Sequence, residues 1–282
     1  VLGLFLGAGV TMIIERVARR IDTREELAEV TDLPILAEIG FVPERRRAIK
    51  DRGRVMLSGP WAEPYRRVRS AVQFVQADAG AAQVPSVFIV TSTSPAEGKS
   101  TTSALVAMAL AEVGVPTVLV GGDFRKPQVD RLVGARNSPS LRDLAVLDVA
   151  RPSIDDVVQQ TDTPDLYVVS AGEPTREVAG LIEATKEVCV EATRRGATVV
   201  IDSSPLQAAN DTLDLLPIVD YTILVLRCGR SSESDLLDTI ETLRRMDTKV
   251  LGIVLIGTTA GRKQLYYYEY YGGPEAPPPG PE

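Results

Sequence analysis

The clearest structural signal in the chain is VFIVTSTSPAEGKST, residues 87–101. It begins as an apolar, strand-forming run, continues as a short polar loop, and leads into the helix-forming stretch 104–111. This context is typical of a phosphate-binding loop, in which backbone N–H groups and a helix N-terminus converge on phosphate oxygens. We therefore expect the loop to bind a nucleotide through Ser94, Pro95, Ala96, Glu97, Gly98, Lys99, Ser100 and Thr101.

Two side chains of the loop have expected roles. Lys99 should reach the β- and γ-phosphates of ATP, and the Ser100 hydroxyl should ligate Mg²⁺. The first glycine of the usual pattern is absent, because Thr93 stands in its place. The alternative is an ordinary strand–turn–helix junction with an exposed lysine, but the combination of strand, loop and helix favours the nucleotide site.

The composition suits a globular core and excludes several kinds of chemistry. Of the 282 residues, 44% are hydrophobic and 24% are charged, which is ordinary for a folded domain. The net charge of −7 argues against nucleic acid as the main partner. The absence of histidine rules out Ser-His-Asp and Cys-His catalysis and histidine metal sites. Cys189 and Cys228 stand alone, as expected for small buried residues in a reducing cytosol.

The N-terminal residues predict attachment to a membrane. Residues 1–14 carry no charge, but a bilayer span needs about 20 apolar residues, so we interpret them as the C-terminal end of a transmembrane helix. The alternative is a buried core helix with a basic flank. Residues 15–60 should form a basic juxtamembrane segment and linker, and the positive-inside rule assigns the chain downstream of the helix to the cytoplasm. The basic side chains behind this expectation are Arg16, Arg19, Arg20, Arg24, Arg45, Arg46, Arg47 and Lys50.

Alternating apolar strands and amphipathic helices predict an α/β fold over residues 61–260. Strands are expected near 86–91, 117–121, 166–169, 198–201, 221–226 and 250–255, with helices near 63–77, 101–113, 176–194, 213–218 and 233–246. This pattern indicates the doubly wound, mostly parallel sheet of a P-loop NTPase, which binds ligands at the carboxyl ends of its strands. Residues 261–282 are rich in tyrosine, glycine and proline, and we expect them to form a disordered tail.

Two aspartates come after apolar strands and are candidates for catalysis and metal binding. Asp202 ends the apolar run 199–201, as a Walker B aspartate does where it reaches Mg²⁺. Asp123 follows the apolar run 118–120 and should face the same cleft. An isolated aspartate is more often a helix cap or a loop residue. The shared topology favours catalytic and metal-binding roles for both aspartates. Lys99 would act with them in catalysis, and Ser100 would bind the metal with them.

The tail concentrates tyrosines that could accept a phosphate: Tyr266, Tyr267, Tyr268, Tyr270 and Tyr271. Such clustering before glycine and proline is hard to explain as a core strand, so a mobile tail is favoured. A tyrosine beside Glu269 on such a tail can enter the cleft of another subunit as a phosphate acceptor.

Together these residues resemble a known family, the bacterial tyrosine autokinases of capsule and exopolysaccharide synthesis, across nearly all of the chain. Residues 91–101 look like the family's Walker A motif, 123–127 like the end of its Walker A′ motif, and 202–205 like its Walker B motif, with Asp211 at the position of a further family aspartate. The tyrosine cluster resembles the family's autophosphorylation tail. The resemblance implies ATP and Mg²⁺ as cofactors.

Two further segments carry the resemblance. Glu63, Arg66 and Arg69 match the family's Glu-x-x-Arg-x-x-Arg motif, which in the relatives helps to build a ring of subunits; the alternative is a solvated helix face with ion pairs three residues apart. Residues 3–43 resemble the end of the chain-length regulator, or polysaccharide co-polymerase, module. The resemblance implies several partners: further copies of the chain in a ring, the membrane, the polysaccharide polymerisation and export machinery, and a cognate tyrosine phosphatase.

Three departures from the family pattern bear on catalysis. Gly121 stands where relatives usually carry the first aspartate of Asp-x-Asp, and Ile256 stands where many have an asparagine that can contact the base. The Asn-Pro element expected near residues 173–175 is absent. Losing one acid–base or metal contact could cost about 10²- to 10⁴-fold in rate while nucleotide binding stays intact.

The leading hypothesis is a membrane-anchored cytoplasmic tyrosine autokinase that transfers the ATP γ-phosphate to the tail and so regulates polysaccharide polymerisation and export. The alternative, favoured by Gly121 and Ile256, is a catalytically degenerate ATP-binding scaffold that controls chain length or export. A third candidate, a partitioning or division-site ATPase, needs a lysine early in the loop, where this chain has Ser94.

Overall fold

The computed structural model describes residues 19–40, 50–51, 53–59, 62–78, 84–146 and 151–259. The predicted end of a transmembrane helix, residues 1–14, and the tyrosine-rich tail, residues 261–282, lie outside these ranges. Within the described residues, none of the helices has both the length and the apolar character that a bilayer crossing requires.

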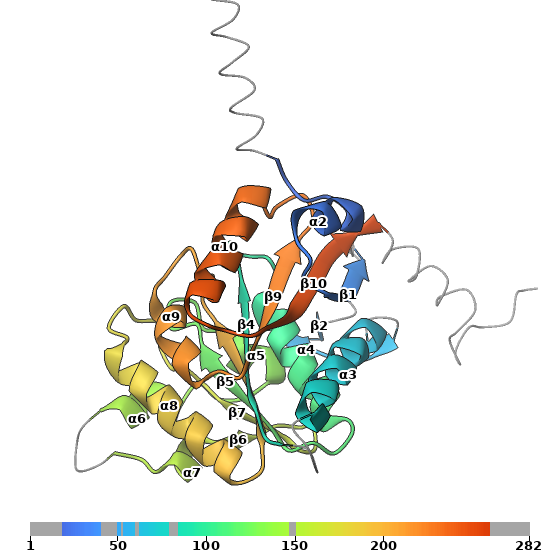
Figure 1. The fold of residues 1–282 in the computed structure, drawn as a ribbon. Helices are drawn as coiled ribbons and strands as arrows, with labels where there is room; N and C mark the ends of the chain where they lie inside the picture. Colours follow the sequence, from blue (N-terminus) through green and yellow to red (C-terminus); the bar gives the residue numbers. More distant parts are fainter. Residues whose placement is uncertain are drawn as a thin grey trace, which may run out of the picture.

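An eight-stranded sheet forms the centre of the fold, in the order β1-β10-β9-β4-β8-β5-β7-β6 (Figure 1). Neighbouring strands of this sheet are parallel, except that β6 runs antiparallel to β7. The strands are β1 (Ile35–Gly40), β4 (Val87–Ser92), β5 (Thr117–Gly122), β6 (Gln159–Gln160), β7 (Leu166–Val169), β8 (Thr198–Ser203), β9 (Tyr221–Arg227) and β10 (Val250–Thr258). The α/β fold with a mostly parallel sheet is therefore confirmed.

Helices cover both faces of the sheet, as the alternation of side chains along the strands requires (Figure 1). On β4, Phe88 and Val90 join the core under α4, whereas Val87 and Ile89 join the core under α8. One face carries α3 (Ala62–Asp78), α4 (Lys99–Ala111) and α5 (Val129–Val133). The other carries α2 (Arg24–Val30), α6 (Leu141–Ala145), α7 (Ile154–Val157), α8 (Ala179–Arg194), α9 (Asp211–Leu215), the 3₁₀ helix η3 (Leu216–Ile218) and α10 (Glu233–Arg245).

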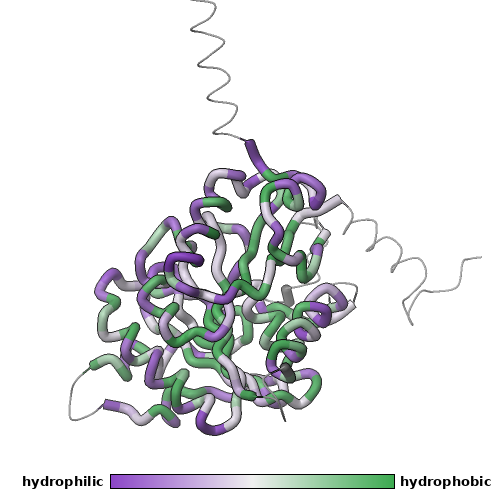
Figure 2. The backbone as a smooth tube through the Cα atoms, in the orientation of Figure 1, coloured by the Kyte–Doolittle hydropathy of each residue, from purple (hydrophilic) through white to green (hydrophobic). Residues whose placement is uncertain are grey.

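The hydropathy of the chain matches this layering. The central strands and the buried sides of the helices are hydrophobic, whereas the outer turns are hydrophilic (Figure 2). Helix α4 is buried along nearly its whole length, because α3 covers the side that faces away from the sheet. Cys189 is buried as expected, whereas Cys228 is only half-buried.

The N-terminal part of the described chain joins the same core, which differs from the boundary expected at residue 61. Strand β1 lies at the edge of the sheet and pairs in parallel with β10. Ile21 and Leu27 are buried against β9 and α10. A small hairpin of β2 (Lys50–Asp51) and β3 (Arg54–Val55) comes next, and Val55 is buried in the core on the α4 side. A segment expected to be juxtamembrane and linker thus contributes α2, the edge strand β1 and the hairpin β2–β3 to the folded unit.

Candidate active site

The predicted phosphate-binding loop connects β4 to α4, at the carboxyl edge of the sheet. Gly98 is the N-cap of α4 and has a φ of 101°, a left-handed conformation that favours glycine. A Cβ on Gly98 would lie 2.7 Å from Cδ1 of Ile256 at the end of β10. The close contact of these two residues therefore accounts for the glycine, and it puts the unusual isoleucine directly against the loop.

The Glu97 carboxylate points into the protein and is fully buried. Its oxygens accept hydrogen bonds from Thr93 Oγ1 at 2.9 and 3.1 Å, from the Ser94 N–H at 2.9 Å and from the Ser231 hydroxyl. Burial raises the pKa of Glu97, and the hydrogen bonds oppose that shift. Glu97, expected as one of the nucleotide-binding loop residues, thus shapes the loop through its side chain.

Ser231 connects the loop to the N-terminal segment. Its carbonyl accepts from the N–H of Ile21 at 3.0 Å, and the N–H of Gly229 donates to the carbonyl of Ile21 at 3.0 Å. Arg20 donates from its side chain to the Gly229 carbonyl at 2.8 Å. Ile21, which comes shortly after the predicted membrane helix, is therefore hydrogen-bonded directly to Ser231, the partner of Glu97.

Lys99 and Asp123 form an ion pair at the centre of the site. The distance between Lys99 Nζ and Asp123 Oδ2 is 2.7 Å, and both side chains are almost completely buried. The other carboxylate oxygen of Asp123 accepts from the backbone N–H of Lys126 at 3.0 Å and from the Ser204 hydroxyl at 3.2 Å. Asp123 follows β5 and Lys99 begins α4, so the fold brings together two residues that the sequence had assigned to one cleft.

Asp202 lies near the carboxyl end of β8 and is 1% exposed. Its Oδ1 accepts from the Ser103 hydroxyl at 3.2 Å, but its buried Oδ2 has no hydrogen-bond partner in the described part of the chain. Burial raises the pKa of Asp202 to about 6, although the neighbouring charge of Lys99 opposes the shift. An unsatisfied buried carboxylate oxygen next to the Ser100 hydroxyl suits a hard divalent cation, which prefers oxygen ligands.

The described residues contain no cluster of three or more His, Cys, Asp or Glu side chains that could hold a metal ion. Mg²⁺ is usually bound by one or two carboxylates and completes its shell with phosphate oxygens and water. Ser100 would supply one hydroxyl and Asp202 one free carboxylate oxygen, which agrees with this usual coordination.

Arg125 and Asp211 form a second ion pair at the edge of the site. The Arg125 guanidinium donates twice to the buried Asp211 carboxylate, over 3.0 and 3.2 Å. Because Asp211 is the first residue of α9, the pair ties the segment after β5 to that helix. This two-point geometry needs an arginine and could not be reproduced by lysine.

Gly121, the main departure from the family pattern, lies at a position where a Cβ would make tight contacts. A Cβ there would be 3.0 Å from the backbone nitrogen of Ala171 and 3.1 Å from Cγ2 of Val129. Gly122 is closer still to its neighbours, since a Cβ would meet Ile201 at 2.8 Å and the carbonyl oxygen of Asp202 at 2.9 Å. A larger residue at position 121 would therefore require Ala171, in the segment after β7, and Val129 to shift by a few tenths of an ångström.

The motif residues Glu63, Arg66 and Arg69 lie on α3 and make contacts within the chain. Arg66 pairs with Glu63 at 3.5 Å, and its Nε donates to Glu112 at 2.9 Å. Arg69 pairs with the same Glu112 carboxylate at 3.0 Å. Glu112 is the C-cap of α4, so the motif fastens α3 to the helix that comes after the phosphate loop. A role in a ring of subunits stays a prediction.

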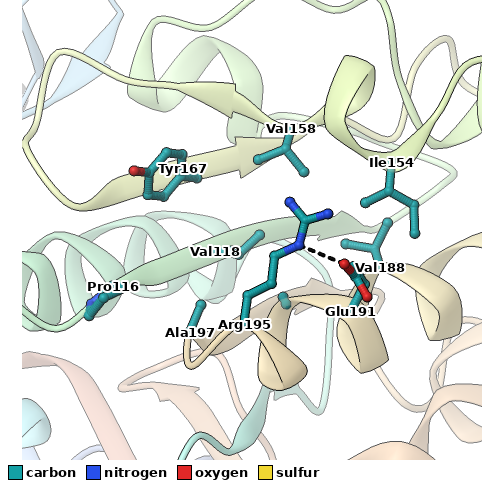
Figure 3. A pocket seen from close by; sticks show the side chains of 10 residues that line it. Pro116, Val118, Ile154, Val158, Tyr167, Val188, Glu191, Arg195 and Ala197 are labelled. Atoms are coloured by element: carbon teal, nitrogen blue, oxygen red, sulfur yellow. Dashed lines mark hydrogen bonds and ion pairs between the residues drawn. The ribbon is translucent and has the colours of Figure 1, made fainter.

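A cavity of about 290 Å³ lies away from the residues of the candidate site (Figure 3). Its lining includes Pro116 and Ala197, which directly precede β5 and β8, and therefore lies at the amino ends of these strands. Figure 3 shows Tyr167 and Val158 along one side of the cavity and the bonded pair Arg195 and Glu191 along the other. Parallel α/β sheets bind their ligands at the opposite, carboxyl edge, so this cavity is not part of the candidate site.

Three hydroxyl groups at the site were not singled out as functional from the sequence: Ser103, Ser204 and Ser231. Ser103 was detectable in principle, because it follows Lys99 by one helical turn and so lies on the same face of α4. Ser204 belongs to the segment after Asp202, but nothing in the sequence shows that its hydroxyl reaches Asp123. The tail tyrosines, Tyr266, Tyr267, Tyr268, Tyr270 and Tyr271, lie outside the described residues.

Comparisons with known proteins agree with the resemblance seen in the motifs. No protein-family model matches the chain. The tyrosine-protein kinase YwqD of Bacillus subtilis is 30% identical over 209 residues, which cover 73% of this chain and 85% of YwqD. EpsB of Ralstonia solanacearum is 26% identical over 284 residues, which cover 96% of this chain but 37% of EpsB.

Solved structures share the same fold. The chimerical protein CapA2B2 is 25% identical with a TM-score of 0.69, over 83% of this chain and 98% of that one. The kinase domain of the Escherichia coli tyrosine kinase ETK is 18% identical with a TM-score of 0.72, over 84% and 95% of the two chains. The septum site-determining protein MinD of Pyrococcus horikoshii, complexed with Mg-ADP, has a TM-score of 0.52 over 64% and 77% of the chains at 19% identity, a likeness of fold alone. Motifs, fold and the relationship to YwqD agree: the chain belongs to the bacterial tyrosine autokinases of capsule and exopolysaccharide biosynthesis.

Proposed function

We propose that the protein is a membrane-anchored, cytoplasmic tyrosine autokinase that uses Mg-ATP to phosphorylate its own C-terminal tyrosines. The observation that carries this proposal is the meeting of Lys99, Asp123 and Asp202 at the carboxyl edge of the sheet, beside a loop of phosphate-binding shape. Phosphoryl transfer needs a phosphate cradle, carboxylates near the metal and a positioned acceptor. The first two requirements correspond to residues within one buried cluster.

The roles of the individual residues are derived from their contacts. The loop N–H groups and the Lys99 ammonium would bind the β- and γ-phosphates, and Ser100 and Asp202 would hold Mg²⁺. When bound there, the ion would neutralise charge on the phosphate oxygens. Asp123, the present partner of Lys99, is the carboxylate that would orient a tyrosine hydroxyl and accept its proton. The γ-phosphoryl group would pass to the tyrosine oxygen, and ADP would leave.

Transfer between subunits is the second part of the proposal. A tail tyrosine, Tyr266, Tyr267, Tyr268, Tyr270 or Tyr271, would enter the site of a neighbouring copy in a homo-oligomeric ring, in which α3 with Glu63, Arg66 and Arg69 contributes to the interface. Each phosphotyrosine adds about −1.5 to −2 charge, so a phosphorylated tail would oppose close packing of subunits. The polysaccharide polymerisation and export machinery would respond to this cycle, and a tyrosine phosphatase would reset it.

A second candidate function is supported by one specific observation. A Cβ at position 121 would crowd Ala171 and Val129, and Ile256 packs against Gly98. Both features suit a catalytically degenerate scaffold that binds ATP and regulates polysaccharide chain length or export through protein contacts. We favour the kinase because the two remaining carboxylates, Asp123 and Asp202, are both buried in the site. Asp123 contacts Lys99, and Asp202 contacts Ser103.

The experiment that separates these candidates uses the whole chain in detergent with Mg-ATP, and phosphotyrosine mapping by mass spectrometry. A Lys99→Met variant controls for transfer by a contaminating kinase, and a variant with all five tail tyrosines changed to phenylalanine controls for the acceptor. The kinase proposal expects phosphate on the tail in the unchanged protein and none in either variant. An unmodified tail on protein that still binds ATP would overturn it and support the scaffold.

A further inference from the structure

A groove lined by basic side chains begins at the edge of the candidate site. We call it the basic groove; it has a volume of about 650 Å³, and its charged lining consists of Arg54, Arg125, Lys126 and Arg131. No carboxylate contributes to the lining within the described residues. This concentration of positive charge is unusual for a chain whose net charge is −7, and it favours an anionic occupant.

Two of the four cations have no acidic partner in the described part of the chain. Arg125 is committed to Asp211, and Arg54 donates to Asp162 at 2.8 Å. Lys126 and Arg131 form no ion pair with any residue of the described ranges, and both are exposed. Their charges are therefore available to a ligand that enters the groove.

The groove is connected to the catalytic residues through the backbone of Lys126. Lys126 is three positions after Asp123, and its backbone N–H donates to the Asp123 carboxylate at 3.0 Å. The lining of the groove therefore includes a residue that is bonded directly to the proposed catalytic carboxylate. Phosphate esters suit such a site, because arginine and lysine donate charge-assisted hydrogen bonds to their oxygens.

The C-terminal tail of the same chain is long enough to cross the sheet from β10 to β5, the strand that precedes the groove. The described chain reaches Thr258 in β10, and four strand spacings separate β10 from β5, which precedes the groove. Strands lie about 4.8 Å apart, so this separation is roughly 19 Å. Tyr266 follows Thr258 by eight residues, a length of chain that can span up to about 28 Å.

We infer that the basic groove binds the phosphorylated tyrosine tail of its own chain, with Lys126 and Arg131 as the phosphate ligands. The unmodified cluster 266–271 carries one acidic side chain, Glu269, whereas each phosphotyrosine adds about −1.5 to −2 charge and three acceptor oxygens. The groove thus distinguishes the product of the reaction from its substrate. Retention of the phosphorylated tail in the groove withholds that tail from the neighbouring subunit. The source of the phosphate rests on the proposed kinase activity, but the binding itself does not.

The first test measures binding with synthetic peptides, so it needs no kinase activity. Fluorescein-labelled peptides of residues 261–282, unmodified or with phosphotyrosine at 268 and 270, are titrated with phosphatase-treated full-length protein without ATP, and anisotropy is recorded. We expect the phosphopeptide to bind at least about tenfold more tightly than the unmodified peptide, and to weaken as salt increases. Equal binding of the two peptides, or no binding, would overturn the inference even if the kinase is active.

Matched variants locate the binding site. Lys126→Ala and Arg131→Ala each remove one cation of the groove, whereas Arg244→Ala removes an exposed cation from the distant helix α10; none of the three forms an ion pair with another described residue. Phosphopeptide affinity should fall about tenfold in the first two variants and stay unchanged in the third, with equal unfolding midpoints confirming that all three fold. An equal loss in all three variants would mean unspecific attraction and would refute the groove as the site.

Protection of the tail from a phosphatase distinguishes the same chain from a second copy. Full-length protein carrying phosphate on its tail is treated with a tyrosine phosphatase at several protein concentrations. Binding within the chain predicts protection that is independent of dilution and is lost in Arg131→Ala. Protection that disappears on dilution would assign the tail to a second copy and overturn the assignment to its own chain.

Discussion

Replacing Glu97 should distort the phosphate loop, because this one carboxylate organises both ends of it. The side chain accepts from the Thr93 hydroxyl, the Ser94 N–H and the Ser231 hydroxyl without exposure to solvent. Two of the three donors are hydroxyls, which can rotate toward other acceptors, whereas the backbone N–H of Ser94 cannot. The cost of the substitution therefore depends mainly on whether Ser94 keeps an acceptor.

Two variants separate these contributions. Glu97→Ala leaves the part-buried Ser94 N–H without its acceptor, at a cost of about 1 kcal/mol. It also creates a cavity, so we expect a total loss of about 3 kcal/mol in the free energy of unfolding. Glu97→Gln keeps one oxygen for Ser94, while its amide can donate to the rotated hydroxyls of Thr93 and Ser231. Its expected cost is about 1 kcal/mol.

The assay combines urea unfolding with a measurement of ATP affinity. Because the loop N–H groups bind phosphate only in one conformation, Glu97→Ala should also weaken ATP binding by about tenfold, which equals about 1.4 kcal/mol. Glu97→Gln should bind ATP within a factor of about three of the unchanged protein, at a cost of less than 1 kcal/mol. The reasoning is refuted if Glu97→Ala unfolds and binds ATP as the unchanged protein does, or if the two variants behave alike.

The same geometry leads to three other predictions. Burial raises the pKa of Glu97 in the folded protein. The resulting contribution to the free energy of unfolding is complete below the unfolded pKa of about 4.3 and is lost as pH rises through the higher folded pKa. Between pH 4 and 8, the free energy of unfolding of Glu97→Gln should therefore fall less with pH than that of the unchanged protein. Gly121→Asp should cost about 1–3 kcal/mol in a thermal or urea melt without increasing tyrosine phosphorylation, because the new side chain meets Ala171; an equally stable and faster variant would contradict this. Glu112→Ala should release Arg66 and Arg69 at a cost of about 1 kcal/mol, since these ion pairs are only partly exposed, and sedimentation velocity should then show smaller species if the arginines stabilise a ring.

The centre of the fold could be predicted because its signals are local. The apolar run 87–90, the loop and the helix after it lie consecutively in the sequence, and parallel strands bring their carboxyl ends to one edge. That rule alone joined Asp123 and Asp202, although they are distant in sequence. The contact between Lys99 and Asp123 is a direct consequence of the same topology.

Features that depend on distant partners could not be predicted. Strand β1 reads as an isolated extended segment until β10 provides a neighbour more than 200 positions later. The inward orientation of Glu97 depends on Ser231, which is 134 residues away. The closed surroundings of Gly121 depend on Ala171, in a segment whose path after β7 no local pattern specifies.

The central claim is that Asp123, beside Lys99, carries phosphoryl transfer to the tail. The most direct test compares the single-turnover rate of tail phosphorylation in the unchanged protein and in Asp123→Asn, with ATP affinity measured alongside. The substitution keeps the size of the side chain and an acceptor for the Lys126 N–H, but it removes the negative charge and the capacity to take up a proton. We predict a rate lower by about 10²- to 10⁴-fold with ATP affinity changed only slightly. An unchanged rate would contradict the account.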